Sequence, residues 1–339
     1  MWKSLAPAGA LAALAIGVAH AAPSQPPPPA PSPVTETLHG VRVTDTWRGM
    51  EKLGPATVDW MKAQGRYTRE LLGSIGPRAG LLARIANFSA SFGPVKSVEV
   101  FAGRTFYLEQ PPGSDNFNLM VRAADGSART LVDVGRLRAE HGGAPYAINY
   151  FEASPDGARV GVGVSAGGSE AAQLYVYDAA TGAQIAGPID RSDFGGLAWS
   201  DDGKTLFFLR LQKTDDPQQK YFNITDQVWD LKGEPREILG APVTQSAIKV
   251  PPVMGAGVSL TPGSDVAVAF VQNGVQNEIE VWTAPAARAA EATAPWRPLA
   301  TRDDAVTALG ARGDDTSLPR HREATTLQVL SVEEGQPPS

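Results

Sequence analysis

The sequence predicts a mainly β protein, a β-propeller preceded by an N-terminal helical hairpin. From about Ser91 onward, short apolar runs rich in Val, Phe, Tyr and Leu alternate with clusters of Gly, Pro, Asp and Asn, as strands alternate with turns. The phrases SPDGARVGVGVS, starting at Ser154, and SDDGKTLFFLRL, starting at Ser200, lie 46 residues apart. A period of about 40–50 residues with several strands per repeat is typical of a propeller blade.

Many short strands are expected in the β-rich part of the chain, and eight runs are examples. They are Val98–Phe101, Thr105–Leu108, Leu119–Arg122, Arg159–Val164, Leu174–Tyr177, Thr205–Leu209, Val266–Val271 and Glu278–Trp282. No helical pattern of about ten residues separates them, which disfavours parallel βαβ units. The alternative is an ordinary β-sandwich, whose turns recur about every 8–12 residues without a repeated phrase.

Residues 56–87 carry the one convincing helical pattern. Val58, Met61, Leu71, Leu72 and further apolar residues up to Ile85 recur at mostly helical spacing. Gly76-Pro77 divides the stretch, because both residue types interrupt helices. We therefore expect two helices arranged as a hairpin.

The first residues have the composition of an export signal. Lys3 precedes an apolar run from Leu5 to Val18, and Ala19-His20-Ala21 places small residues at the two positions that signal peptidase inspects. We expect cleavage after Ala21 and an exported, periplasmic protein; an uncleaved membrane anchor is the alternative. Residues 22–34 are proline-rich and are expected to be an extended linker.

Charge and composition exclude several classes of protein. The 339 residues carry a net charge of -6, so the chain has no basic footprint for nucleic acid, and no membrane contact is expected after signal cleavage. Cysteine is absent, so there is no disulfide framework and no thiolate metal site. With four histidines, a centre built from several histidines is not expected, and we predict no cofactor and no metal.

The sequence resembles the prolyl oligopeptidase family of serine peptidases, in order, over about residues 40–335. The phrases that carry the resemblance are VTDTWRGME, VDWMKAQGRYTRELL, SPDGARVGVGVSAGGSEAAQLYVYDAATGAQI, DQVWDLKGEPREILGAP, VQNGVQNEIEVW and RHREATTLQVLSV. Thr46 stands where the family has proline, Gly49 where it has a large tryptophan, and Asp230-Leu231 where a histidine is common. These departures weaken any inference of prolyl specificity.

The resemblance implies a seven-bladed propeller that covers the active site of a following α/β-hydrolase domain. In the family, the catalytic Ser, Asp and His lie in the hydrolase domain, and the N-terminal helices pack against it. At about 46 residues per blade, Ser91 to Ser339 would hold five to six of the seven blades. We therefore expect a signal peptide at 1–21, a linker at 22–34, an N-terminal segment with the helical hairpin at 35–90 and a truncated propeller at 91–339.

Ser165 raises the question of catalysis, because Gly163-Val164-Ser165-Ala166-Gly167 matches the G-x-S-x-G nucleophile elbow. An elbow requires a strand, a sharp turn and a helix, whereas here a strand is followed by glycines and by the strand Leu174–Tyr177. If the catalytic residues occurred along the chain in the order Ser, Asp, His, then His321 would be the only histidine after Ser165. The resemblance places His321 in a propeller strand. We expect Ser165 and its glycines to form the tip of a blade hairpin.

Other candidate residues are also expected to be structural. Asp201-Asp202 and Asp303-Asp304 are acidic pairs that suggest metal binding or acid–base chemistry, but turns favour Asp for its backbone hydrogen bonds. Trp199 is expected in a blade core. We therefore predict no catalytic, cofactor-binding or metal-binding residues in this chain.

Two functions of different classes follow from these observations. The first is the non-catalytic propeller portion of an exported prolyl oligopeptidase-like serine peptidase that hydrolyses short peptides, with peptide partners only when a hydrolase domain is joined to it. The second is a standalone periplasmic propeller that binds a partner without enzymatic activity. By itself the chain is expected to be inactive.

Overall fold

The computed structural model describes residues 23–90, 93–312, 315–320 and 328–332. The chain divides into two compact units, Met1–Ser91 and Phe92–Ser339. The expected signal peptide, 1–21, and His321 lie outside the described residues.

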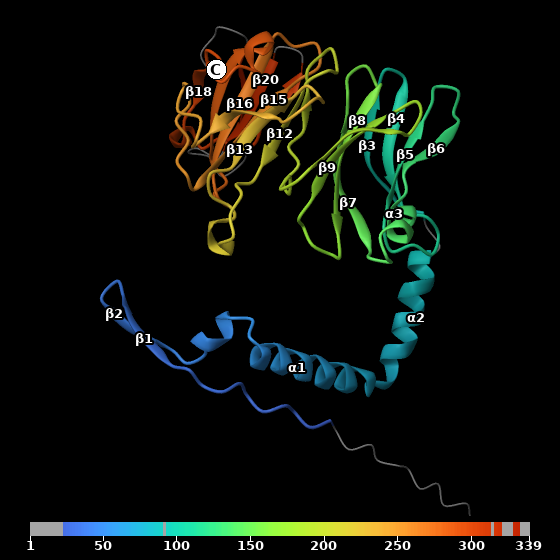
Figure 1. Ribbon diagram of the computed structural model, residues 1–339, viewed down its shortest axis with the longest axis vertical. Coiled ribbons are helices and arrows are strands. Elements are labelled where there is room, and N and C mark those ends of the chain that lie inside the picture. Colours follow the sequence, from blue (N-terminus) through green and yellow to red (C-terminus); the bar gives the residue numbers. More distant parts are fainter. Residues whose placement is uncertain (1–22, 91–92, 313–314, 321–327, 333–339) are drawn as a thin grey trace, which may run out of the picture. The chain divides into compact units, whose positions relative to one another are not determined.

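The N-terminal unit contains a β-hairpin followed by helices (Figure 1). Its elements are β1 (Val34–Leu38), β2 (Val41–Asp45), the 3-10 helix η1 (Arg48–Glu51), α1 (Pro55–Gly73) and α2 (Gly76–Ala90). The two predicted helices are present, and α1 begins with proline at a position where its missing N–H costs nothing. No residue of α1 is buried, so this unit does not form a hydrophobic core around that helix.

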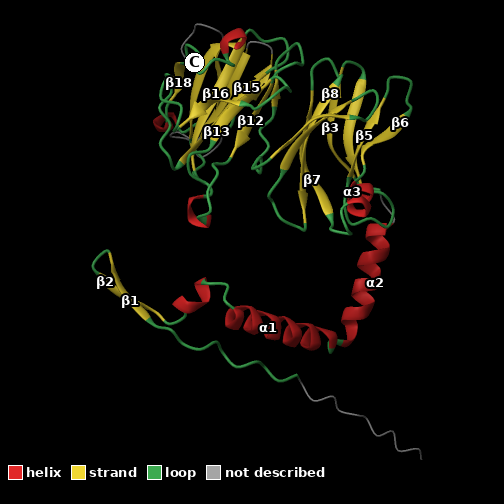
Figure 2. Ribbon diagram, in the orientation of Figure 1, coloured by secondary structure: helices red, strands yellow, loops and turns green. Residues whose placement is uncertain are grey.

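The second unit is a series of antiparallel sheets in which consecutive strands are hydrogen-bonded neighbours (Figure 2). The first sheet contains β3 (Val95–Phe101), β4 (Arg104–Glu109), β5 (Asn118–Arg122) and β6 (Ala128–Val132). The second contains β7 (Tyr146–Ala153), β8 (Arg159–Ala166), β9 (Gln173–Asp178) and β10 (Gln184–Ile189), with the short helix α3 (Val134–Glu140) before β7.

Three further sheets follow in the same order. The third contains β11 (Ala198–Trp199), β12 (Leu206–Arg210), β13 (Thr225–Trp229) and β14 (Arg236–Gly240), with η2 (Pro217–Gln219) between β12 and β13. The fourth contains β15 (Met254–Leu260), β16 (Val266–Asn273), β17 (Ile279–Pro285) and β18 (Arg297–Ala300), with η3 (Ala286–Arg288) before β18 and η4 (Arg302–Asp304) after it. The fifth contains β19 (Gly310–Arg312), β20 (Asp315–Arg320) and β21 (Gln328–Val332). The part of the chain that the structure describes thus confirms the predicted mainly β, propeller-like fold.

Hydrophobic clusters lie between successive sheets. One cluster joins the first and second sheets through Phe106 and Val162, and another joins the second and third through Leu174 and Phe208. The third and fourth sheets share a cluster that includes Phe207, and the fourth and fifth share one that includes Leu318. Each sheet is therefore stabilised by its neighbours, as propeller blades are.

Adjacent residues on one strand serve different clusters, because side chains alternate between the two faces of a sheet. On β12, Leu206 and Phe208 pack toward the second sheet, while Phe207 between them packs toward the fourth. A strand that is buried on both faces has a continuous apolar sequence, which explains the run TLFFL in the repeated phrase.

Candidate functional site

Ser165 is the next-to-last residue of β8 and only 3% exposed. Its hydroxyl donates a hydrogen bond to Asn149 Oδ1 on the neighbouring strand β7 (2.8 Å). The turn that follows places Gly167 and Gly168 in the left-handed region and leads to β9, so the motif lies in a β-hairpin. The expected position of Ser165 at the hairpin tip is wrong, because Ser165 and Gly163 both lie within β8 and only Gly167 and Gly168 form the turn. No helix follows Ser165, as a nucleophile elbow would require.

The first glycine of the motif has a packing role. Gly163 on β8 lies directly opposite Tyr150 on β7 in the strand pairing. A Cβ atom added to Gly163 would lie 2.1 Å from Tyr150 Cζ, so the ring occupies the space above the glycine. The Tyr150 hydroxyl then donates to the carbonyl oxygen of Ser192 (2.5 Å) ahead of the third sheet. An aromatic ring that covers a strand glycine is a known device of β-sheets, and it accounts for Gly163 without catalysis.

The repeated phrase forms the turn between the first and second strands of a sheet; we call this end of the second unit the turn end. In the second sheet, Ser154 Oγ donates to Asp156 Oδ1 (2.5 Å) and accepts from the N–H of Arg159 (3.0 Å). In the third, Ser200 Oγ donates to Asp202 Oδ1 (2.7 Å). These side chains satisfy the turn's own polar groups, which is the ordinary use of Ser and Asp in turns.

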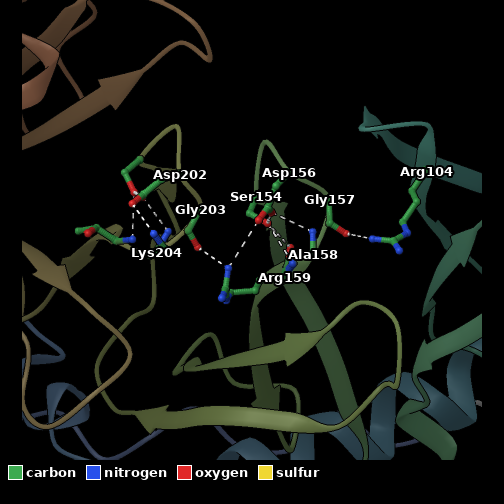
Figure 3. A network of polar contacts seen from close by, with 11 residues as sticks. Arg104, Ser154, Asp156, Gly157, Ala158, Arg159, Asp202, Gly203 and Lys204 are labelled. Carbon is green, nitrogen blue, oxygen red and sulfur yellow. Dashed lines mark hydrogen bonds and ion pairs between the residues drawn. The ribbon is translucent and has the colours of Figure 1, made fainter.

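Two arginines link successive sheets at the turn end (Figure 3). Arg104, the first residue of β4, donates through Nη1 to the carbonyl oxygen of Gly157 in the next sheet's turn (2.6 Å). Arg159, the first residue of β8, donates in the same way to Gly203 in the third sheet (3.0 Å). A guanidinium that donates to a carbonyl is a charge-assisted hydrogen bond, so the repeated turn also sets the spacing between sheets.

The link between the third and fourth sheets has different chemistry. Thr205 occupies the position that corresponds to Arg159, and Asp201 Oδ1 instead accepts the N–H of Gly263 in the fourth sheet (3.0 Å). Asp202 contacts Lys204, with 3.3 Å between Oδ2 and Nζ. Both aspartates of this pair therefore have structural partners.

The first strands of the sheets are also linked by polar contacts. Glu99 Oε2 on β3 accepts the N–H of Ala153 on β7 (2.9 Å), and the carbonyl oxygen of Glu152 accepts the indole N–H of Trp199 on β11 (3.0 Å). Trp199 is buried, as predicted. A cavity of about 230 Å³ lies where these strands end, and Glu152, Trp199 and Leu260 contribute to its lining.

Burial changes the acidity of the two glutamates. Burial raises the pKa of Glu99 to about 7, although the hydrogen bond from Ala153 opposes the shift. Burial, assisted by the negative charge of Glu99, raises the pKa of Glu152 to about 8. A perturbed acid in a cavity is a candidate for function, and of the two glutamates only Glu152 contributes to the lining of this cavity. The Glu99 carboxylate instead links the first and second sheets through its hydrogen bond from Ala153. No local pattern in the sequence marks either residue.

The opposite end, which we call the loop end, carries the loops between second and third strands. There Phe194, ahead of β11, and Tyr221, between β12 and β13, form an aromatic pair with ring centroids 5.7 Å apart. The two residues are 52% and 50% exposed. Beside them, Lys220 Nζ lies 2.8 Å from Asp193 Oδ2, and this carboxylate raises the pKa of the lysine. Exposed aromatic residues in loops are suited to contacts with a peptide or another domain.

The remaining predicted candidates do not form a site. Asp304 is the third residue of η4 and completes a capping box with the N-cap residue Thr301, whose N–H and hydroxyl donate to the Asp304 carboxylate. Among the described residues there is no group of three or more His, Asp and Glu side chains that could hold a metal ion. Within the same ranges, no helix is long and apolar enough to cross a membrane.

One protein family matches nearly the whole chain. The family model of the prolyl oligopeptidase N-terminal β-propeller domain matches residues 26–337. A search of curated proteins found no match.

Solved structures share the fold. A prolyl endopeptidase, from a study of inter-domain dynamics in catalysis and specificity, is 21% identical, with a TM-score of 0.76 over 92% of this chain and 45% of its own. A mutant of prolyl oligopeptidase B from Galerina marginata, bound to a 35mer hydrolysis and macrocyclization substrate, is 14% identical, with a TM-score of 0.72 over 94% and 48%. The chain thus spans about half the length of the solved structures that it matches.

Proposed function

Because this chain belongs to the prolyl oligopeptidase family, as its N-terminal β-propeller domain, we propose that it is the non-catalytic portion of a serine peptidase that hydrolyses short peptides. The observation that carries the proposal is the continuous match over residues 26–337. In acyl transfer by such a peptidase, a serine attacks the peptide carbonyl while a histidine removes its proton.

We propose that the propeller limits which substrates reach the hydrolase domain. The hydrophobic clusters between successive sheets support a rigid body that admits short flexible peptides and excludes folded proteins. The exposed pair Phe194 and Tyr221 at the loop end offers apolar contact area to a passing peptide. The substrate noted for the Galerina marginata protein is a peptide, which agrees with this class of ligand.

The chain by itself is proposed to be inactive. The hydroxyl of Ser165 is buried and bonded to an amide oxygen of Asn149, which cannot act as a general base. A serine hydrolase also needs an oxyanion hole beside its nucleophile. The serine that reacts in the native peptidase is therefore expected outside residues 1–339.

Export to the periplasm is part of the proposal. It is based on Lys3, the apolar run that follows it and Ala19-His20-Ala21. Mass spectrometry of the native protein should find Ala22 as the first residue, and an intact Met1 in the cytosolic fraction would contradict export.

Labelling with a fluorophosphonate separates the peptidase from the standalone binding module. The native protein is purified with an antibody against the propeller, treated with the probe and digested, and the labelled serine is identified. A label on a serine beyond Ser339 supports the peptidase. An unlabelled native protein that ends at Ser339 supports the binding module, and a label on Ser165 would contradict both.

A further inference from the structure

A polar groove runs along the third sheet, on the outer strands β13 and β14. Its volume is about 510 Å³, within the range of small-molecule sites. The lining residues that matter here are Arg210, Lys213, Thr225, Gln227 and Glu237. They come from β12, the β12–β13 loop and the two outer strands, so one sheet supplies them all.

The most informative residue of the groove is Gln227, which is only 5% exposed. Its Nε2 donates to Thr225 Oγ1 (3.1 Å), while its Oε1 is buried without a hydrogen-bond partner among the described residues. A buried carbonyl oxygen that lacks a partner is destabilising, and most such groups in proteins are paired. A ligand N–H that enters the groove would supply the missing donor.

Some charged residues of the groove have ion-pair partners and others do not. Arg191, also in the lining, and Arg210 both contact the carboxylate of Asp190, and Arg210 Nη1 lies 3.9 Å from Glu234. Within the described part of the chain, neither Lys213 nor Glu237 has an ion-pair partner. The groove thus offers one free cation and one free carboxylate in addition to the Gln227 oxygen.

We propose that this groove binds a short peptide with free ends. Such a peptide carries a terminal carboxylate for Lys213, an ammonium group for Glu237 and backbone N–H groups for Gln227. A phosphate or a simple carboxylate would satisfy the lysine alone. The site shares its ligand class with the proposed peptidase, but it rests on the groove, and its test measures binding to this chain without turnover.

How much each contact contributes to the affinity depends on how deeply its residue is buried. An exposed ion pair changes affinity by about two- to fivefold, so Lys213→Gln and Glu237→Gln should each weaken binding by that amount. Loss of a hydrogen bond to a buried group changes affinity by about tenfold or more, so Gln227→Met should have the largest effect.

The test is isothermal titration of the chain with trialanine, with its C-terminal amide and with its N-acetyl form. Trialanine should bind saturably, and each blocked form should bind about two- to fivefold more weakly. In Lys213→Gln the difference in affinity between trialanine and its C-terminal amide should disappear. The control variant is Lys232→Gln, because Lys232 lies in the β13–β14 turn outside the lining, and it should bind like the wild type.

Several results would overturn the proposal. They are no saturable binding up to 10 mM, equal binding of the free and blocked peptides, and equal effects of Lys213→Gln and Lys232→Gln. If Gln227→Met fails to fold, the side-chain amide resonance of Gln227 is followed by NMR in the wild type. That resonance should shift on saturation with trialanine, and an unchanged resonance would also overturn the proposal.

Discussion

Gly157→Ala tests whether the repeated turn fixes the contact between the first and second sheets. Gly157 has φ +62°, and a Cβ atom there would lie 3.0 Å from the backbone oxygen of Phe101 and 3.3 Å from Ala102 Cβ. The left-handed conformation costs an alanine about 1–2 kcal/mol. The contact with the neighbouring sheet adds about 1–3 kcal/mol, because a backbone oxygen in a packed sheet cannot move aside freely.

Gly126→Ala is the matched control within the same unit. Gly126 has φ +87° in the β5–β6 turn, and nothing lies within 4 Å of the position where its Cβ would be. Both variants are therefore destabilised by the left-handed conformation, and only Gly157→Ala is also destabilised by the close contact between sheets. Gly157→Ala should lose about 2 kcal/mol more, which corresponds to a Tm about 4–8 °C lower for a unit of this size.

Thermal and urea unfolding, followed by circular dichroism, measure this difference. Displacing the turn should also weaken the hydrogen bond from Arg104 to the Gly157 carbonyl oxygen. If the two alanine variants were equally destabilised, the turn would not determine the contact between the sheets.

Three further predictions concern polar groups that are buried or partly buried. Because their folded pKa values are raised, Glu99 and Glu152 contribute stability that is complete below pH 4 and lost as the pH rises through about 7–8. Glu152→Gln should reduce the loss of unfolding free energy between pH 5 and 9 by about 1.4–3 kcal/mol. A dependence of stability on pH that stays unchanged, as in the exposed control Glu170→Gln, would contradict this. Burial also raises the pKa of Asp226 well above its ordinary range, and its carboxylate accepts the N–H of Val258 in the neighbouring sheet. In urea unfolding, Asp226→Asn should make stability depend less on pH, whereas Asp226→Ala should lower the free energy of unfolding by about 1–3 kcal/mol. Equal stabilities of the two variants would refute this. Ser165→Ala should cost no more than about 1 kcal/mol in unfolding and leave fluorophosphonate labelling of the native protein unchanged, and a lost label in the folded variant would contradict that.

The strands and turns of the second unit could be predicted because their determinants are local. In SPDGAR, Ser154 and Asp156 bond to the backbone of their own turn, so the phrase specifies a turn wherever it occurs. Each of the eight strands named in the sequence analysis lies on a strand of the structure, with ends that differ by at most three residues. The apolar runs between the turns are strand-length, which is sufficient to predict strands.

The contacts between strands and sheets could not be predicted, because they depend on residues far apart in the chain. Gly163 matches a catalytic motif in the sequence, yet its role is set by Tyr150, which reaches it through the pairing of β7 with β8. Glu99 lies 54 residues from Ala153, and Asp226 lies 32 residues from Val258. A single sequence contains no signal for such partners.

The candidate binding residues were missed for the same reason. Phe194 and Tyr221 are single aromatic residues in separate loops, and they form a pair only through the fold. Gln227 lies in the phrase DQVWDLKGEPREILGAP, which the sequence analysis used only for the family resemblance. A loop aromatic beside glycines, as in SDFGG, was the one available indication of Phe194.

We propose that this propeller controls access to a peptidase, and the size limit of the native protein's substrates is the decisive measurement for that role. A short peptide and the same sequence inserted in an exposed loop of a folded protein are offered at equal concentrations, and subtilisin serves as the control that both are accessible. The native protein should cleave the peptide and leave the folded protein intact over the same period. Cleavage of both at similar rates, or of neither, would contradict it.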